Sequence, residues 1–72
     1  MKFIDFDISK AKELFVRNEV YDIMLHNGIV QEDVVLFSFD GENLETIYKF
    51  SNLDGDFWET SAVKMYRIKK EH

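Results

Sequence analysis

The 72-residue chain contains no cysteine, no proline, three glycines and two histidines. Without cysteine it can form no disulfide and no thiolate metal site, and His26 and His72 alone are too few ligands for a structural zinc ion. No apolar run approaches the roughly 18 residues that cross a bilayer. Acids at Asp5 and Asp7 lie where a signal peptide would be apolar. We therefore expect a cytoplasmic protein without a membrane segment, whose fold depends on its apolar core.

The apolar content is sufficient for one small folded domain. Hydrophobic residues make up 46% of the chain and aromatic residues 15%, which argues against intrinsic disorder. A chain of this length buries only about 60% of the surface that its unfolded form exposes, and it leaves no room for a second domain. The prediction is a single domain, residues 1–72, of modest stability.

Turn signals and strand-forming segments alternate along most of the chain. Each glycine follows an asparagine or aspartate, a combination that tolerates positive φ and marks hairpin turns. These dipeptides are Asn27-Gly28, Asp40-Gly41 and Asp54-Gly55. Residues 34–39 are rich in β-branched and aromatic side chains, and residues 44–50 alternate in polarity. Residues 57–69 also fit a strand, with a bulge expected because neither face is purely apolar.

The N-terminal third predicts a helix followed by a segment that fits two structures. Apolar residues recur with helical spacing at Ile8, Ala11, Leu14 and Phe15. Asp7 is a suitable N-cap, and Asn18 can end the helix in the left-handed conformation. Residues 19–26 fit either a strand or a second helical piece that Gly28 closes. We favour the strand.

Together these elements predict an α+β fold: one N-terminal helix packed on an antiparallel β-meander of three to five strands, with residues 2–6 as a weak extra strand. The segment 34–39 has Val35, Phe37 and Phe39 on one face and Val34 and Leu36 on the other. A helix of about ten residues, roughly 15 Å long, covers only one face of a sheet. We therefore expect self-association or a constitutive partner. The alternative is a sheet that curls until its aromatic side chains fill its own concave side.

Charge is spread unevenly along the chain. Residues 18–63 hold ten acidic side chains against one base, Lys49, so this segment carries −9. Residues 1–17 sum to +1 and residues 64–72 to +3, which gives the total of −5. A surface dominated by one sign attracts partners of the opposite sign. The competing interpretation is that the acids only keep the domain in solution.

Signals for catalysis or metal binding are weak. His26 is the one internal base of the kind that activates a nucleophile, and we expect it to be a solvated loop residue beside a turn. Oxygen-bearing side chains recur in residues 52–59 as in a calcium loop, but Phe57 and Val63 occupy the positions of the required glycine and acid. We interpret this segment as a hairpin turn. The basic tail, residues 64–70, suggests nucleic acid, but the acidic segment would repel a duplex. We expect no enzyme activity, no metal, no cofactor and no direct nucleic-acid contact.

The favoured interpretation is a non-enzymatic interaction protein, an inhibitor or adaptor, whose acidic face docks on a basic protein surface, including one that normally binds nucleic acid. On a meander the second and third turns lie at opposite ends of the sheet, so their carboxylates form a band along an edge. The candidate contact residues are Asp40, Glu42, Glu45, Asp54, Asp56 and Glu59, with Trp58 or Tyr48 as an aromatic anchor. In size and charge the chain is similar to the small acidic inhibitors with which phages occupy DNA-binding sites, a likeness that covers no specific motif.

The second hypothesis is a small-ligand-binding or regulatory dimeric module. It would use a pocket between the helix and the sheet, lined by Phe15, Phe37 and Tyr48. A concave pocket with converging polar groups would support this hypothesis, and a solid core would exclude it.

Overall fold

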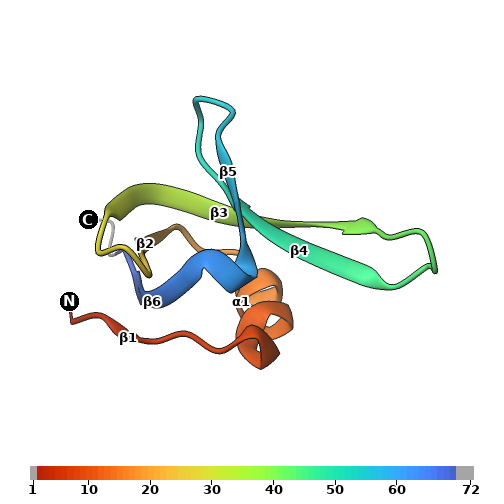
Figure 1. Cartoon of the computed structure of the whole chain (residues 1–72), viewed down its shortest axis with the longest axis horizontal. Helices are drawn as coiled ribbons and strands as arrows, with labels where there is room; N and C mark the ends of the chain where they lie inside the picture. The colour runs from red at the N-terminus through yellow and green to blue at the C-terminus, as the bar shows by residue number, and fades with distance from the viewer. Residues whose placement is uncertain (1, 70–72) are drawn as a thin grey trace.

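The computed structural model describes residues 2–69. Figure 1 shows one helix beside a sheet from which two hairpins project in different directions. The elements in chain order are β1 (Ile4–Asp5), the 3₁₀ helix η1 (Ile8–Lys10), α1 (Ala11–Arg17), β2 (Tyr21–Leu25), β3 (Val30–Asp40), β4 (Thr46–Ser51), β5 (Phe57–Glu59), the 3₁₀ helix η2 (Thr60–Ala62) and β6 (Val63–Ile68). The predicted α+β class, with its N-terminal helix and antiparallel strands, is confirmed.

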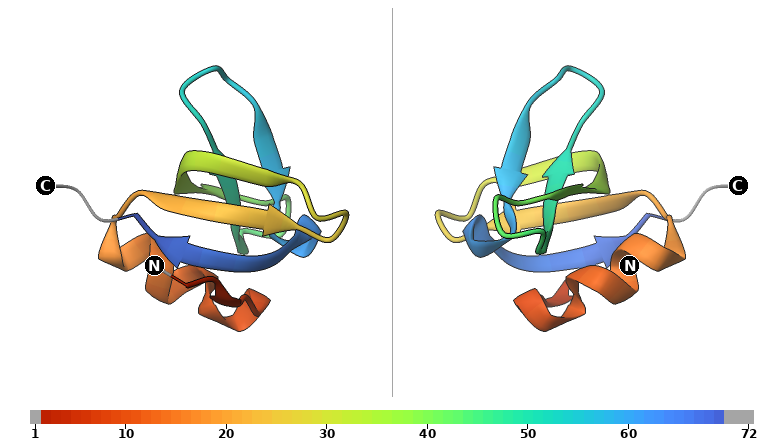
Figure 2. Two further views of the ribbon diagram at one scale, coloured as in Figure 1. Left: turned by 90° about the vertical axis from the view of Figure 1, so that its left-hand side faces the viewer. Right: turned by 90° about the vertical axis from the view of Figure 1, so that its right-hand side faces the viewer.

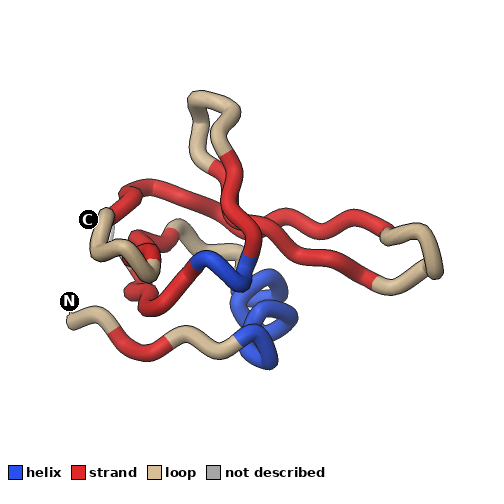
Figure 3. Tube along the Cα trace, viewed as in Figure 1, coloured by secondary structure: helices blue, strands red, loops and turns tan. Residues whose placement is uncertain are grey.

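The sheet has six strands in the order β1-β6-β2-β3-β4-β5, and every pair is antiparallel. Strands β2 to β5 form the predicted meander, but β6 returns to pair with β2, and β1 pairs with β6 (Figure 3). The prediction of three to five strands was therefore too low. Residues 57–69 are not one bulged strand, because η2 turns the chain between β5, which pairs with β4, and β6 on the opposite side of β2.

Strand β3 is long enough to belong to both halves of the sheet. Its first residues pair with β2 and its later residues pair with β4. A register shift between Tyr21 and Ile23 lies opposite Asp33, whose φ is 59°, and such bulges increase the local twist of a sheet. Figure 2 shows that the sheet is curled. The curl brings Phe6, which follows β1, into edge contact with Phe50 of β4, with ring centroids 5.6 Å apart.

The concave side of the curled sheet holds the core. Its fully or nearly fully buried members are Leu14, Tyr21, Ile23, Val34, Leu36, Phe50, Val63 and Tyr66. The hydroxyl of Tyr21 donates a hydrogen bond of 2.7 Å to the carbonyl oxygen of Leu14, which ties the helix to β2. Burial raises the pKa of this hydroxyl above its ordinary value. The curling that we gave as the alternative to a partner therefore occurs, and it fills one face of the sheet.

The helical segment begins as the 3₁₀ helix η1 after the predicted cap Asp7, continues as α1 from Ala11, and ends at the predicted Asn18. The carboxylate of Asp7 accepts hydrogen bonds from the amide and hydroxyl of Ser9, and Asn18 ends the helix with φ 54° and ψ 48°. Ala11 and Leu14 are buried, and the helix packs against β3 and β4. Residues 21–25 form β2, so the strand interpretation is confirmed. Within residues 2–69 no helix has the length and apolarity to cross a membrane.

A buried charge cluster joins β2 to β6 and to the bulge in β3. Asp22, which is 2% exposed, lies 2.9 Å from Nε of Arg67 and 3.5 Å from Nζ of Lys69, and it accepts a 3.2 Å hydrogen bond from the amide of Asp33. Burial opposes ionisation of Asp22, but the hydrogen bonds from Arg67 and Asp33 and the charge of Lys69 outweigh it and lower its pKa. Lys69 also binds Glu32 and Asp33, so the acids at this end of β3 have a cationic partner.

The three predicted turns form, but one uses an unexpected residue. Gly28 and Gly55 adopt positive φ, at 88° and 90°. In the turn between β3 and β4 the left-handed residue is Leu44, with φ 65°, and Gly41 does not have positive φ. A Cβ on Gly41 would meet the side chain of Glu45. Gly41 thus provides space, and the conformational role that we assigned to it belongs to Leu44.

Candidate docking surface

The turn between β3 and β4 carries three of the predicted contact carboxylates. Asp40 ends β3, Glu42 lies in the turn and Glu45 precedes β4, and all three residues are exposed. The turn is closed by the amide of Gly41, which donates to the carbonyl of Glu45 at 2.7 Å. The carboxylate of Glu45 accepts a 3.1 Å hydrogen bond from the amide of Asn43. Glu45 therefore shapes the turn, while Asp40 and Glu42 extend from it.

The turn between β4 and β5 carries two more carboxylates, and Asn52 holds it in shape. The side-chain oxygen of Asn52 accepts hydrogen bonds from the amides of Asp54, at 3.1 Å, and Asp56, at 3.0 Å. The backbone amide of Asn52 donates to the carbonyl of Asp56 at 3.1 Å. The hairpin interpretation of this segment is confirmed. Both Asp54 and Asp56 are exposed.

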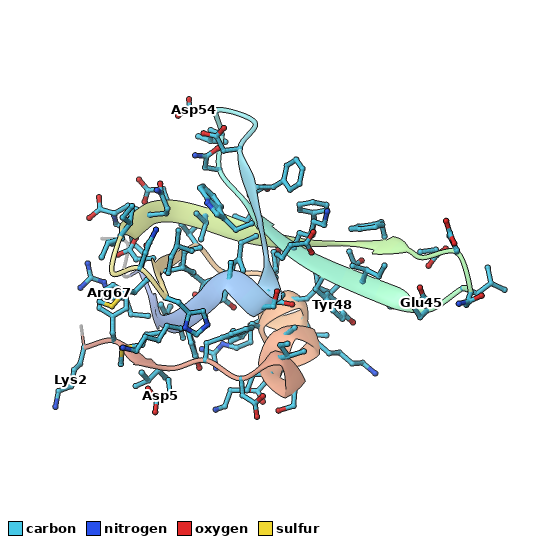
Figure 4. The ribbon with its side chains drawn as sticks, viewed as in Figure 1. Lys2, Asp5, Glu45, Tyr48, Asp54 and Arg67 are labelled. Carbon is cyan, nitrogen blue, oxygen red and sulfur yellow. The ribbon has the colours of Figure 1, made fainter. Side chains whose placement is uncertain are left out.

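Most of the hairpin carboxylates are not neutralised within the domain. Among the described residues, none of Asp40, Glu42, Glu45, Asp54 and Asp56 forms a salt bridge, whereas Glu59 lies 3.1 Å from Nζ of Lys49. Figure 4 shows Glu45 and Asp54 at the ends of two separate arms. The predicted arrangement of acids at opposite ends of the meander thus forms, with β4 connecting the two acidic turns.

Between the two acidic turns, the hairpin strands present an apolar surface on the side away from the core. Cross-strand pairing places these side chains on one face: Val35 is opposite Ser51, Phe37 opposite Lys49, Phe39 opposite Ile47, Phe57 opposite Ser51, and Glu59 opposite Lys49. We call these eight residues the outer face. Phe57 is 57% exposed, Val35 42% and Phe39 39%. Curling of the sheet therefore leaves this face uncovered, although it fills the opposite one.

Lys49 lies among the rings of the outer face. Its Nζ is 4.6 Å from the ring centroid of Phe57 and 5.4 Å from that of Phe39, and the rings of Phe37 and Phe39 stack with centroids 6.0 Å apart. Cation–π contacts and the ion pair to Glu59 fix this ammonium inside the face. The only base between residues 18 and 63 is therefore paired locally and leaves the acidic turns uncompensated.

Two exposed leucines lie in the hairpin turns. Leu44 is 84% exposed and Leu53 is 99% exposed. Leu53 lines an open hollow of about 300 Å³ together with Val20, Asp33 and Val35. Because Val35 belongs to the outer face, the hollow continues that face toward the β4–β5 turn.

The aromatic residues that we predicted as an anchor or as the lining of a pocket lie on two different faces of the sheet. Trp58 and Tyr48 pack against the core and are half-buried, so the exposed ring beside the acidic residues is that of Phe57. Phe15 contacts Tyr48 with centroids 5.5 Å apart, but Phe37 lies on the outer face. The prediction of a pocket lined by Phe15, Phe37 and Tyr48 is therefore wrong. Alternate residues of β3 point to opposite sides of the sheet, and Phe37 lies on the side away from Phe15 and Tyr48.

The sequence also offered His26 as a candidate base. His26 is exposed beside the β2–β3 turn and lines a shallow hollow of about 230 Å³ with Ser61. In the described part of the chain no hydrogen bond joins this imidazole to Ser61, and no group of three or more histidine and acidic side chains is placed to hold a metal ion.

Sequence reasoning found the acidic turns and the shared face of Val35, Phe37 and Phe39 in β3, but it missed the apolar part of the outer face that β4 and β5 supply. Phe57, Ile47 and Lys49 were not singled out together, although their alternation with Trp58, Tyr48 and Phe50 was visible. The missing information was the register, since only pairing brings Lys49 opposite both Phe37 and Glu59. Comparison of the chain with protein families, with characterised proteins and with solved structures finds no match.

Proposed function

We propose that this chain is a non-enzymatic interaction protein that docks its acidic hairpin region on a basic surface of another protein. It would act as an inhibitor or an adaptor, and surfaces that normally bind nucleic acid are the clearest class of target because they are basic. The single observation that carries the proposal is the set of five hairpin carboxylates that have no cationic partner among the described residues. Their charge attracts a cationic surface during encounter.

The distribution of ion pairs supports docking over a purely solubilising role. Several acids elsewhere have cations: Arg17 binds Glu19 at 3.1 Å, and Lys69 binds Asp22, Glu32 and Asp33. Among the described residues, three acids near the N-terminus also form no salt bridge: Asp5, Asp7 and Glu13. Five of the eight described acids without a salt bridge lie at two turns, on either side of an exposed apolar face. An acidity that only kept the domain in solution would require neither this separation from the bases nor the adjacent apolar face.

The experiment starts with capture of the partner from an extract of the native host and its identification by mass spectrometry. The purified partner is then titrated with the intact chain by calorimetry at low and high salt. We expect affinity to fall steeply as salt rises, because exposed charges are screened. An affinity that stays constant across the salt range would contradict electrostatic docking.

A matched pair of variants separates local charge from net charge. The hairpin variant Glu42→Gln/Asp54→Asn and the control Asp5→Asn/Glu13→Gln each remove two exposed acids and change the formal charge from −5 to −3. The hairpin variant should weaken binding by about tenfold at low salt, and the control by less than about twofold. Equal losses would show that only the overall charge matters.

A further inference from the structure

The outer face has the composition of an interface core. Its exposed rings are rigid and bury a large area for little loss of side-chain entropy, and aromatic residues are enriched at the centres of interfaces. The stacked rings of Phe37 and Phe39 and the Lys49 ammonium between Phe39 and Phe57 are already fixed by contacts within the face. The hollow beside Val35 and Leu53 adds a concave site for a partner side chain.

Building on the proposed function, we infer that the outer face is the apolar centre of the docking interface. The occupant is a protein surface with apolar side chains bordered by lysine or arginine. Its apolar residues cover Val35, Phe39 and Phe57, and its cations lie against the carboxylates of the two turns. The interface would then have the usual order of an apolar centre and a polar rim.

Charge distinguishes this partner from a second copy of the chain. Residues 30–59 contain eight acids and one base, so they carry −7. Two copies packed through their outer faces would bring two such surfaces together, and the one base of each is already engaged with Glu59 of its own chain. Like charges placed opposite one another across an interface weaken association. A cationic border on the partner removes this repulsion and adds attraction.

The test uses the intact chain and two synthetic probes. One is a short peptide in which leucine and lysine alternate, and the other replaces each leucine by serine, which keeps the charge and removes the apolar groups. Binding is followed by the movement of backbone amide signals in two-dimensional NMR. We expect the leucine peptide to bind about tenfold more tightly. The shifts should be concentrated at Val35, Phe37, Phe39, Lys49 and Phe57.

A matched pair of variants tests the apolar contribution. Phe39→Ser/Phe57→Ser removes two exposed side chains of the outer face, and Ile8→Ser/Val16→Ser removes two exposed apolar side chains from η1 and α1. The first pair should weaken binding of the leucine peptide about tenfold and leave the serine peptide unchanged. The helix pair should change neither by more than about twofold. If Phe39→Ser/Phe57→Ser does not fold, the NMR shifts of the unaltered chain still show whether the leucine peptide binds the outer face.

Three outcomes overturn the inference. Equal affinity for the two peptides would show that the outer face contributes nothing, while electrostatic docking by the turns would stand. Shifts confined to the helix would place the contact elsewhere. A mass in sedimentation equilibrium that rises to that of a dimer, and returns to a monomer in Phe39→Ser/Phe57→Ser, would identify a second copy as the occupant. Loss of peptide binding in Glu42→Gln/Asp54→Asn tests the proposed function separately, because that variant leaves the outer face intact.

Discussion

Nζ of Lys49 lies 3.1 Å from the carboxylate of Glu59, its cross-strand neighbour, and 4.6 Å from the centroid of the Phe57 ring. Lys49 is the only base in residues 18–63, and these contacts hold it within the outer face. The turns on either side therefore keep their negative charge. The functional proposal depends on this local pairing, and changing Lys49 is its first test.

Replacing Lys49 should affect binding more than stability. The pair with Glu59 is partly exposed, so Lys49→Met should change the free energy of unfolding by less than about 1 kcal/mol. It removes a positive charge from the centre of the proposed interface and keeps an apolar side chain. Binding of the alternating leucine–lysine peptide should tighten about twofold to fivefold at low salt. Calorimetry measures this change, and weaker binding would show that the ammonium itself contacts the ligand.

The Asp22 cluster should make an important contribution to stability. Asp22→Asn keeps the shape but removes the charge that Arg67 and Lys69 neutralise, and we expect a loss of about 2 kcal/mol in urea unfolding. Asp54→Asn, at an exposed turn without an ion pair, is the control and should change stability by less than about 0.5 kcal/mol. Equal effects of the two substitutions would show that the cluster adds no stability.

The same cluster predicts the direction of acid sensitivity. The pKa of Asp22 is lowered in the folded chain, because hydrogen bonds and cations overcome the effect of burial. Its contribution is therefore complete above about pH 4, where the unfolded carboxyl is ionised, and is lost as pH falls through the folded pKa. The difference in unfolding free energy between the unaltered chain and Asp22→Asn should shrink from neutral pH to about pH 2. A difference that grows on acidification would have the wrong sign.

Tyr21 should contribute to stability through its buried hydroxyl. Tyr21→Phe leaves the carbonyl of Leu14 without its 2.7 Å hydrogen bond, and should cost about 1 kcal/mol. Burial raises the pKa of Tyr21, so its contribution is complete below about pH 10 and is lost as pH rises through the folded pKa. Urea unfolding should therefore show the alkaline loss reduced in Tyr21→Phe. An identical alkaline profile for both chains would contradict this assignment.

Leu44 should be a site where substitution stabilises the fold. Its φ of 65° is unfavourable for a bulky residue, and its side chain is almost fully exposed. Leu44→Asn should raise the free energy of unfolding by about 0.5–1 kcal/mol, because asparagine tolerates the left-handed conformation better. Leu53→Asn is the matched control, since Leu53 is exposed without positive φ, and it should give no gain. Thermal unfolding compares the two.

The fold could be predicted from the sequence as far as local signals determine it. The cap at Asp7, the helix end at Asn18 and the turns at Gly28 and Gly55 all depend on the conformational preferences of one or two residues. The division of residues 57–69 into β5 and β6 could not be predicted, because the two pieces differ mainly in their distant partners, β4 and β2. Long-range pairing has no local signature.

The sequence predicted the acidic residues of the candidate site and the apolar side chains that β3 supplies, but it did not predict the side chains that β4 and β5 add. Acids in turns are exposed whatever the topology, so Asp40, Glu42 and Asp54 could be identified from sequence. In β5 the ring of Trp58 points toward the core and that of Phe57 lies on the outer face. This arrangement depends on how β5 pairs with β4. A shift of one residue in register would exchange the two rings. The side of the sheet that stays uncovered is likewise a property of the whole fold.

Hydrogen exchange of the chain alone and bound to its captured partner tests the central claim most directly. In the unbound chain we expect rapid exchange in three segments with exposed backbone. These are the turns at 41–45 and 52–56 and the edge strand β5. We predict that the partner slows exchange in peptides covering residues 37–59 and leaves residues 2–26 unchanged. Protection confined to residues 2–26, with the two turns exchanging as fast as in the free chain, would contradict docking through the acidic hairpins.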